Sequence, residues 1–283
     1  MRNDLRLQPV DYLVIGHITQ DLTPNGPVMG GTAAYSALTA QALGLRVGIV
    51  TAHDPNVNML TLQNIPVAAA ISETTTTFEN KQTAHGRVQH VFHPAPVLTL
   101  ADVPEVWRTA PIIHLGPVLQ EVDPKLTRAF ENAFIALTPQ GWLRTYNQDG
   151  LVHYTDWPEA RYVLEGANAA VISVEDVQGS EEIIDEMSAS IRVLAVTEGS
   201  NGARLYWNGD VRTFRAPAAE EVDPTGAGDI FATGFFYRLH TTRDPWEAAR
   251  FATQLAANSV TRPGLSGIPT REEINDCKIE ILP

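Results

Sequence analysis

Residues 221–236 carry the clearest chemical pattern, because a polar, Gly-rich turn leads directly into an apolar, helix-like segment. Gly226 and Gly228 allow positive φ and have no Cβ, so successive N–H groups can point into one anion-binding concavity. If the turn opens a helix, the positive end of the helix dipole adds to the attraction for a phosphate. Asp229 beside such a site can take the proton of a hydroxyl that attacks the phosphate. The alternative is an ordinary helix N-cap, where Asp and Gly are common.

The full string resembles the C-terminal signature of the PfkB, or ribokinase-like, family of sugar and nucleoside kinases. It reads Asp-Pro-Thr-Gly-Ala-Gly-Asp from Asp223 to Asp229, followed by Phe-x-x-Gly-Phe. The resemblance implies that Asp229 is the catalytic base and that the backbone of Gly226, Ala227 and Gly228 forms an anion hole. It also implies ATP and Mg²⁺. The chain has no G-x-x-x-x-G-K-[ST] pattern, which excludes a P-loop kinase.

An acceptor site is predicted near the start of the chain. Residues 11–16 are a short apolar run that predicts a buried strand, and residues 17–22 are expected to form the loop after it, where doubly wound sheets bind ligands. Asp21 can accept two hydroxyl hydrogen bonds at once, as sugar sites require, although a solvated loop Asp is the alternative. Ribokinase-like enzymes place a substrate-binding Asp a few residues after the first Gly. The resemblance therefore assigns acceptor binding to Asp21 and to nearby Thr19, where ribokinases often have Asn.

Gly30 and Gly31 precede a predicted helix over residues 32–43 that ends at a Gly. A Gly-Gly pair alone indicates only a turn. The whole run resembles the family's N-terminal signature, in which the glycines let the substrate approach the backbone. Tyr35, predicted to contact the substrate, stands where the family often has Asn, and Thr32 stands where many ribokinases have Lys. Both changes argue against ribose, and the pattern is similar to the inositol-kinase-like branch.

The resemblance also implies a nucleotide site. A hairpin explains the glycines that follow the predicted strand at residues 192–197. The family has Thr-x-Gly-x-x-Gly here, for ATP phosphates and ribose. In the predicted helix at residues 245–260, one Asn lies where relatives often contact adenine. The residues assigned to the nucleotide are Thr197, Gly199, Gly202, Thr225 and Asn258.

Two carboxylates are metal candidates by the same resemblance. The family often has Asn-x-x-Glu after the strand predicted at residues 169–174, and the Glu places Mg²⁺ through water. This chain has Ser-Val-Glu-Asp at residues 173–176, which makes Asp176 the candidate, with capping of the next helix as the alternative. In many relatives a monovalent cation such as K⁺ lies near the position of Asp223 and the loop at residues 261–267.

Residues 74–80 and 86–92 are β-prone with polar alternation, which predicts exposed strands. The resemblance implies a small β lid, here approximately residues 22–29 and 72–96, inserted in a single domain over residues 1–283. It also implies a homodimer formed through the lid.

Three histidines, at positions 85, 90 and 93, raise the question of a metal site. Alternation along a strand would place His85 and His93 on one face and His90 on the other, so surface histidines are the favoured reading.

Apolar runs elsewhere alternate with helical patterns. This alternation predicts an α/β, ribokinase-like, doubly wound and largely parallel sheet flanked by helices. A hairpin is expected around Asn208-Gly209. An amphipathic helix is predicted over residues 125–134, and the loop at residues 138–142 has no assigned role. Further strands are predicted at residues 46–51, 111–116 and 134–138.

Composition limits the function classes. The chain of 283 residues with 44% hydrophobic content suits one large α/β domain. A net charge of −13 disfavours nucleic-acid binding, although N–H groups and Mg²⁺ can still neutralise ATP. The single cysteine, Cys277, excludes a disulfide framework and favours a cytoplasmic location. A polar N-terminus and the lack of any apolar run near ~20 residues argue against a signal peptide and a membrane partner.

Together these patterns predict a carbohydrate kinase that moves the γ-phosphoryl of ATP to a hydroxyl of a sugar or polyol, with a small-molecule acceptor as its partner. A nucleoside kinase of the same fold is the first alternative. A non-catalytic sugar or nucleotide sensor is the second, favoured by the altered metal motif and disfavoured by the intact Asp229. A dinucleotide-dependent oxidoreductase is discounted, because the first strand ends in Gly-His-Ile-Thr rather than G-x-G-x-x-G.

Overall fold

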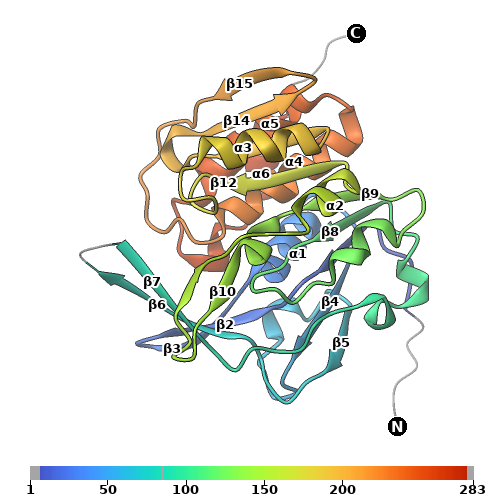
Figure 1. Cartoon of the computed structure of the whole chain (residues 1–283), viewed down its shortest axis with the longest axis vertical. Coiled ribbons are helices and arrows are strands. Elements are labelled where there is room, and N and C mark those ends of the chain that lie inside the picture. Colours follow the sequence, from blue (N-terminus) through green and yellow to red (C-terminus); the bar gives the residue numbers. More distant parts are fainter. Residues whose placement is uncertain (1–6, 84–85, 279–283) are drawn as a thin grey trace.

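The structure is a computed structural model that describes residues 7–83 and 86–278 (Figure 1). Its helices are α1 (Thr32–Ala42), α2 (Ala160–Glu165), α3 (Glu181–Ser190), α4 (Ala227–Thr242), α5 (Pro245–Ser259) and α6 (Arg271–Cys277). Its strands are β1 (Tyr12–Ile15), β2 (Thr19–Thr23), β3 (Gly26–Gly30), β4 (Val47–His53), β5 (Val67–Ile71), β6 (Thr77–Thr83), β7 (Gly86–Phe92), β8 (Ile112–Leu115), β9 (Phe134–Leu137), β10 (Arg144–Tyr146), β11 (Val152–Tyr154), β12 (Ala169–Ser173), β13 (Val193–Thr197), β14 (Ala203–Trp207) and β15 (Asp210–Phe214).

The main sheet has nine strands in the order β15-β14-β13-β12-β9-β8-β1-β4-β5. The seven strands from β13 to β5 are parallel, and the hairpins add β14 and β15 as antiparallel strands at one edge. The parallel strands are short runs of Val, Ile, Leu and Ala, as expected for strands that are covered on both faces. The predicted α/β, largely parallel fold is therefore confirmed, as is the hairpin around Asn208-Gly209.

Helices cover both faces of the main sheet, and alternate residues of each strand enter opposite cores. On one face, small and aromatic side chains of α1, α4 and α5 pack against Val14, Ile49 and Ala195. On the other face, α2, α3 and the buried rings of Trp107 and Trp142 pack against the neighbouring positions of the same strands.

A second sheet of four strands, in the order β3-β2-β6-β7, projects from the first (Figure 1). The segment at residues 17–22 was expected to be a loop, but Thr19–Thr23 is strand β2, because it pairs with β3 and β6. The second sheet packs on the main body through Phe78, Val91, Val118 and Leu119. The β10–β11 hairpin lies against β7, where the Val91 N–H donates to the Gly150 carbonyl at 2.8 Å.

The helix predicted over residues 125–134 is wrong. Pro124–Arg128 forms a short 3₁₀ turn capped by Asp123, and Asn132 then adopts a φ of 60° as the chain turns towards β9. Burial of Leu126 and Phe130 in the core decides the path of this connection over helix propensity.

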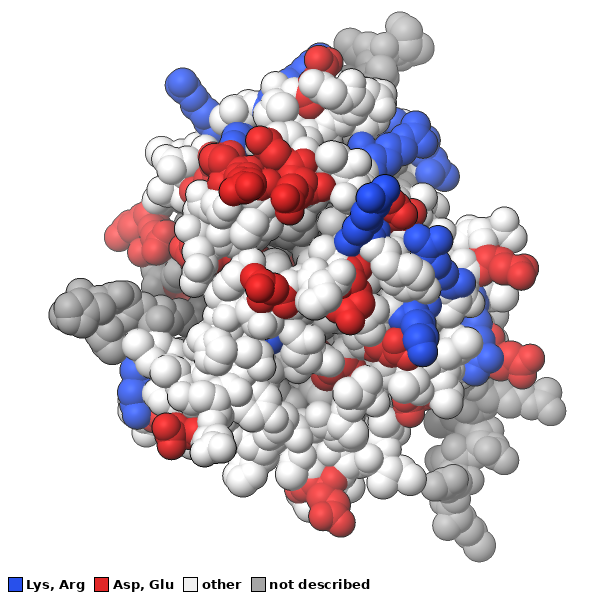
Figure 2. All heavy atoms as spheres, in the orientation of Figure 1, with Lys and Arg blue, Asp and Glu red and all other residues white. Residues whose placement is uncertain are grey.

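Acidic side chains gather over α3 on the face shown in Figure 2, where Glu181, Glu182, Asp185 and Glu186 are exposed. Within the described ranges, no helix is both long enough and apolar enough to span a membrane.

Candidate active site

The predicted site residues lie around the carboxyl edge of the main sheet. On one side of β1, the sheet continues with β4 and then β5. On the other side it continues with β8, β9, β12 and β13, so the strand order reverses between β1 and β8. The ends of these two strands approach closely, because a Cβ on Gly16 would collide with the Gly116 carbonyl. Doubly wound sheets bind ligands at such a reversal.

Helix α4 begins in the middle of the signature. Gly226 is its N-cap residue with a φ of +81°, a conformation that disfavours any residue with a Cβ. No side chain caps the helix, and the N–H groups of Gly228 and Asp229 have no backbone acceptor outside α4 within the described chain. These N–H groups and the helix dipole together can bind an anion. The predicted helix start and anion-binding turn therefore coincide.

The Asp229 carboxylate lies in the first turn of α4 and meets the start of α1. Its environment raises its pKa to about 6, chiefly through desolvation by the surrounding protein, although water still reaches part of the residue. A hydrogen bond with the Thr32 side chain and the charge of Arg144 oppose this rise, and the charge of Asp176 adds to it. A carboxyl group with this pKa is mostly ionised at neutral pH and is still basic enough to accept a proton.

The acceptor candidates come together in β2, β3 and the start of α1. Thr19 is buried and Asp21 is partly exposed on the same face of β2. A Cβ on Gly30 would collide with the Asp21 carboxylate, and one on Gly31 would lie 2.7 Å from the His17 carbonyl oxygen. Gly31 also has a φ of +87°. The two glycines therefore make room for the Asp21 carboxylate and for the turn into α1.

Tyr35 connects the acceptor side to the signature. Its side chain is buried, and a Cβ on Gly226 would collide with its ring, so the ring supports the turn that opens α4. Burial raises the pKa of the Tyr35 hydroxyl, as do the charges of Asp229, Asp223 and Asp21. The carboxylates of both sides of the site thus act on one hydroxyl group.

Asp223 ties the loop before α4 to the end of α5. Its carboxylate accepts from the Thr225 N–H at 2.9 Å and from the Gly264 N–H at 2.8 Å. The Val222 and Asp223 N–H groups both donate to the carbonyl of Val260. These bonds bring Asn258, in the last turn of α5, beside the signature.

The remaining nucleotide candidates form the turn between β13 and β14. Gly199 has a φ of +58° and a Cβ there would meet nothing within 4 Å, whereas a Cβ on Gly202 would collide with the Phe214 carbonyl. Thr197 ends β13, and its hydroxyl donates to the Ile172 carbonyl at 3.3 Å. The predicted hairpin is confirmed, and one of its glycines is open to an incoming ligand.

Asp176 follows β12, and its side chain is only 6% exposed. One carboxylate oxygen accepts from the Gln140 amide at 2.8 Å and lies 3.7 Å from Arg144 Nη2, and the other accepts from the Ser173 N–H. The alternative role of Asp176 as a cap of the next helix is wrong, because Ser180 caps α3. The 138–142 loop, which had no assigned role, forms most of the 3₁₀ turn Pro139–Leu143 and provides Gln140.

Sequence reasoning missed Arg144, the first residue of β10. No motif contains it, and its only sequence signal is a basic residue that follows a Gly-containing loop after a buried strand. Its Nη1 donates to Gln89 Oε1 at 3.4 Å, which links the β7 strand of the second sheet to Asp176.

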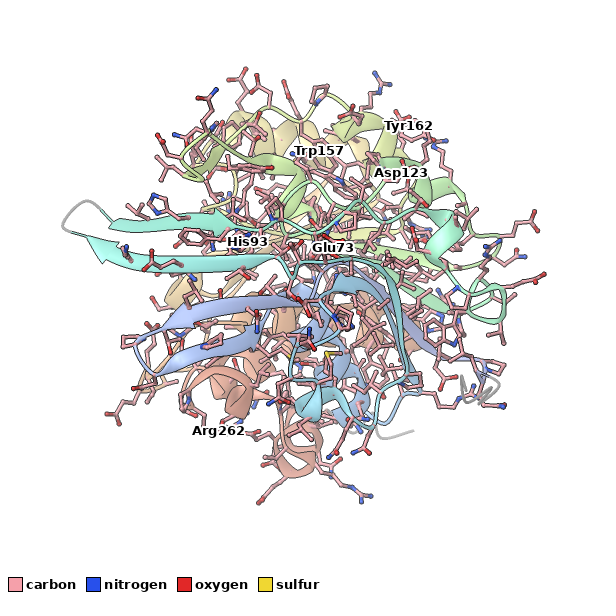
Figure 3. The ribbon with its side chains drawn as sticks, turned by 90° about the horizontal axis from the view of Figure 1, so that it is seen from below. Glu73, His93, Asp123, Trp157, Tyr162 and Arg262 are labelled. Atoms are coloured by element: carbon pink, nitrogen blue, oxygen red, sulfur yellow. The ribbon has the colours of Figure 1, made fainter. Side chains whose placement is uncertain are left out.

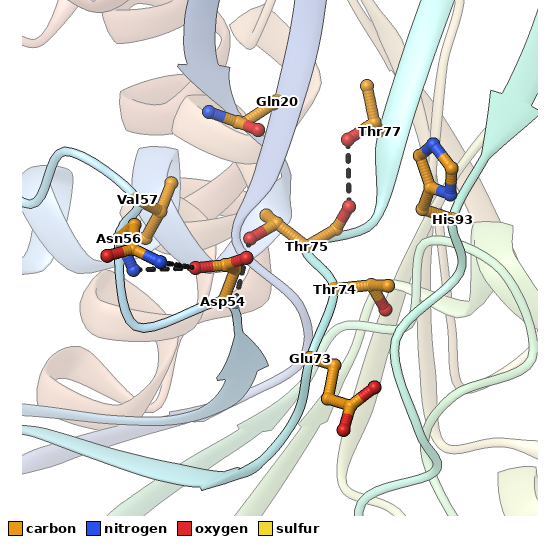
Figure 4. A pocket seen from close by; sticks show the side chains of 9 residues that line it. All are labelled: Gln20, Asp54, Asn56, Val57, Glu73, Thr74, Thr75, Thr77 and His93. Atoms are coloured by element: carbon orange, nitrogen blue, oxygen red, sulfur yellow. Dashed lines mark hydrogen bonds between the residues drawn. The ribbon is translucent and has the colours of Figure 1, made fainter.

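A polar pocket of about 380 Å³ lies at the base of the second sheet, at the end of β4 (Figure 4). It lies on the face of β2 that carries Gln20, opposite to Asp21, and Asp54 in it already accepts two hydrogen bonds from Asn56. In Figure 3, Glu73 and His93, which line this pocket, are well separated from Arg262 of the loop that follows α5.

Of the three histidines, His90 lies in β7 and His93 follows it, and position 85 is outside the described residues. In the chain that the structure describes, no three His, Cys, Asp or Glu side chains gather as a metal cluster.

The nine-stranded, largely parallel sheet flanked by helices and the projecting second sheet form a ribokinase-like α/β fold. The structure aligns with a pyrophosphate-dependent kinase of the ribokinase family, solved with a pyrophosphate analog and myo-inositol, with a TM-score of 0.77 and 19% identity over 94% of this chain and 99% of that chain. The family model for "pfkB family carbohydrate kinase" matches residues 159–271. The matched stretch includes the signature at residues 223–229, and over this stretch the chain is similar to that family.

Two curated relatives add detail. The chain is 26% identical over 281 residues to the cytidine kinase of Thermococcus kodakarensis, which covers 90% of this chain and 98% of that protein. It is 31% identical over 153 residues to the inositol 3-kinase of Zea mays, which covers 53% of this chain and 39% of that protein.

Proposed function

We propose that the protein is a kinase that transfers the γ-phosphoryl group of ATP to a hydroxyl of a sugar or polyol, with Asp229 as the general base. The observation that carries this proposal is the position of the Asp229 carboxylate, in the first turn of α4 beside unpaired N–H groups, with a raised pKa of about 6. A hydroxyl next to Asp229 loses its proton to the carboxylate as its oxygen attacks phosphorus. The backbone of Gly226, Ala227 and Gly228 is assigned the stabilisation of negative charge on the transferring group. Of these, the Gly228 N–H has no backbone acceptor outside α4, whereas the Ala227 N–H donates to the Pro224 carbonyl at 3.1 Å.

Acceptor binding is assigned to Asp21, Thr19 and the Gly30-Gly31 backbone. The Asp21 carboxylate accepts two hydroxyl hydrogen bonds and so orients a polyol for attack. Tyr35 was predicted to contact the substrate. Because it is buried beneath Gly226, we expect it to hold the signature loop in place rather than to line the acceptor site.

The nucleotide is assigned to Thr197, Gly199, Gly202, Thr225 and Asn258. Hydrogen bonds from the Val222 and Asp223 N–H groups to the Val260 carbonyl hold the end of α5 against the signature loop. The nucleoside part of ATP, which pyrophosphate lacks, would extend from the phosphates to the end of α5, and this supports ATP as the donor. The open side of Gly199 gives the same support.

Two carboxylates of the site, those of Asp176 and Asp223, are candidates for holding metal ions. Asp176 is surrounded by N–H donors, so it suits Mg²⁺ through water rather than by direct ligation, and Mg²⁺ ordinarily binds through substrate phosphates together with few carboxylates. When bound, Mg²⁺ neutralises phosphate charge. A monovalent cation is assigned to the neighbourhood of Asp223, where carbonyl groups of the loop at residues 261–267 would complete its site.

The second sheet is proposed to act as a lid over the acceptor and to form a homodimer. Leu22 and Phe92, which are 41% and 38% exposed, lie on its face opposite to Asp21 and would be covered in such a dimer.

A nucleoside acceptor is the second candidate. The match to a cytidine kinase over nearly the whole of both chains favours it. The two candidates share the donor chemistry and differ only in the group that Asp21 holds.

The test is consumption of ATP with Mg²⁺ by the purified protein in the presence of D-ribose, D-fructose, 2-keto sugar acids, myo-inositol or cytidine. We expect turnover with one acceptor class and a loss of more than ~100-fold in Asp229→Asn, with ATP binding retained. Asp185→Asn, on the exposed face of α3, is the matched control and should behave as wild type. Undiminished turnover in Asp229→Asn would refute the assignment of the base.

A further inference from the structure

Arg144 sits where the two sheets meet. Its side chain is 26% exposed and its Nη2 atom lies 3.7 Å from the Asp176 carboxylate. It also acts electrostatically on Asp229, where it is the positive charge that favours the ionised carboxylate. A guanidinium in this position lies beside Asp176, which follows β12, and within electrostatic range of the proposed base.

The backbone that carries Arg144 is anchored. The Gln120 amide donates to the carbonyls of Trp142 at 2.8 Å and Arg144 at 2.9 Å. The Gly141 N–H donates to the Pro117 carbonyl, and a Cβ on Gly141 would collide with the same backbone. Anchoring of this kind reduces the entropy lost when a side chain binds a ligand.

A chain of side-chain hydrogen bonds joins Arg144 to the proposed acceptor site. Arg144 donates to Gln89 at 3.4 Å, Gln89 donates to Asn80 at 2.9 Å, and Asn80 donates to Asp21 at 3.3 Å. The two outer bonds are long and therefore weak. Hydroxyl groups that bind Asp21 compete with Asn80 for the carboxylate, so the chain can rearrange when an acceptor enters.

We propose that Arg144 binds the transferring phosphoryl group, and that the Asp21–Asn80–Gln89 chain adjusts the position of its guanidinium when the acceptor binds. This inference rests on the proposed function, which it deepens by adding a charged phosphate ligand from the β10 strand. An Arg fits the task because its planar set of N–H donors matches two phosphate oxygens at once.

The competing explanation is that Arg144 only neutralises the buried Asp176. Removing one partner of such a pair leaves an uncompensated charge, so a loss of activity in Arg144→Met alone decides nothing. The double variant Arg144→Met/Asp176→Asn separates the two roles. A structural role predicts recovery of both thermal stability and metal-free pyrophosphate affinity in the double variant, whereas phosphate binding predicts recovery of stability only. Turnover is not the criterion here, because Asp176 is itself proposed to place Mg²⁺.

The experiment measures pyrophosphate and ATP affinity by calorimetry, together with kcat and donor KM. We expect Arg144→Met and the double variant to bind pyrophosphate at least ~10-fold more weakly and to lose ~100-fold or more in kcat/KM, with partial rescue by Arg144→Lys. Arg161→Met, which removes an exposed arginine paired with Glu165, is the matched control. Wild-type pyrophosphate affinity in the double variant would overturn the phosphate-binding role. Pyrophosphate affinity can be measured without turnover. If the wild-type protein phosphorylates no acceptor but the Arg144 variants still bind pyrophosphate more weakly, the proposed function is refuted and the phosphate-binding role of Arg144 is retained.

The chain of hydrogen bonds is tested with Gln89→Leu and with the acceptor that the wild-type protein phosphorylates. We expect that acceptor to tighten ATP binding about fivefold or more in wild type and to lose this effect in Gln89→Leu. Equal tightening in both proteins would overturn the coupling.

Discussion

The raised pKa of Asp229 predicts how turnover depends on pH. A base must be ionised, and with a pKa of about 6 the carboxylate is about nine-tenths ionised at pH 7, half ionised at pH 6 and about one-tenth ionised at pH 5. We therefore expect kcat/KM to fall about tenfold between pH 7 and pH 5, with a midpoint near the pKa of the free enzyme. An unperturbed Asp, ionising near 3.8, would give an almost flat profile over this range.

The assay is the initial rate at subsaturating acceptor and saturating ATP, in buffers of constant ionic strength from pH 5 to pH 8. Thr32→Val removes the hydrogen bond that favours the ionised Asp229, so the midpoint should move to higher pH, whereas Thr32→Ser should restore it. A profile that is flat from pH 5 to pH 7 in wild type, or a midpoint unmoved in Thr32→Val, would refute the reasoning. Far-ultraviolet circular dichroism at each pH separates loss of turnover from unfolding.

Further predictions concern stability and binding. The folded-state pKa of Asp229 exceeds its ordinary value of 3.8, so above pH 6 ionisation of this carboxyl group lowers the free energy of unfolding by at most about 3 kcal/mol. Asp229→Asn removes this effect. Scanning calorimetry should therefore show a Tm higher by a few degrees at pH 7 and unchanged at pH 4. Gly226→Ala should lower stability by more than ~1 kcal/mol in urea titrations, because it combines positive φ with a collision against Tyr35, whereas Gly228→Ala, whose Cβ meets open space, should not. Asp21→Asn should raise acceptor KM about 10- to 100-fold and leave the KM for ATP unchanged, and a change confined to ATP would contradict its placement.

Local patterns predicted those parts of the molecule that depend on neighbours in sequence. The buried strands, the helix after Gly31 and the helix start at Gly226 follow from apolar runs and glycine geometry, and the structure has all of them. The segment at residues 17–22 was predicted to be a loop, and part of it is strand β2. It is a strand because it pairs with β3 and β6, and its own residues do not indicate this pairing.

The candidate site was predicted unevenly for the same reason. Asp229 and the glycines around it stand within one string, so their types and spacing indicate phosphate chemistry directly. Arg144 touches Gln89 and Asp176, which lie 55 and 32 positions away in the chain, and no local pattern reports such contacts. Tyr35, which was predicted in the acceptor site, has its ring packed against Gly226, a contact between residues 191 positions apart that the sequence pattern does not indicate.

The way the second sheet is attached bears on how acceptor specificity changes during evolution. Its apolar contact with the body includes the small cluster of Phe78 and Val91 with Val118 and Leu119, and single hydrogen bonds to Gly150 and Arg144 add to it, whereas the start of α4 is built into the large core. Substitutions at partly or fully exposed positions such as Asn80 and Gln89 therefore change the acceptor surface at little cost in folding free energy. A lineage of such proteins can exchange one alcohol for another while the machinery that handles the phosphate is inherited unchanged.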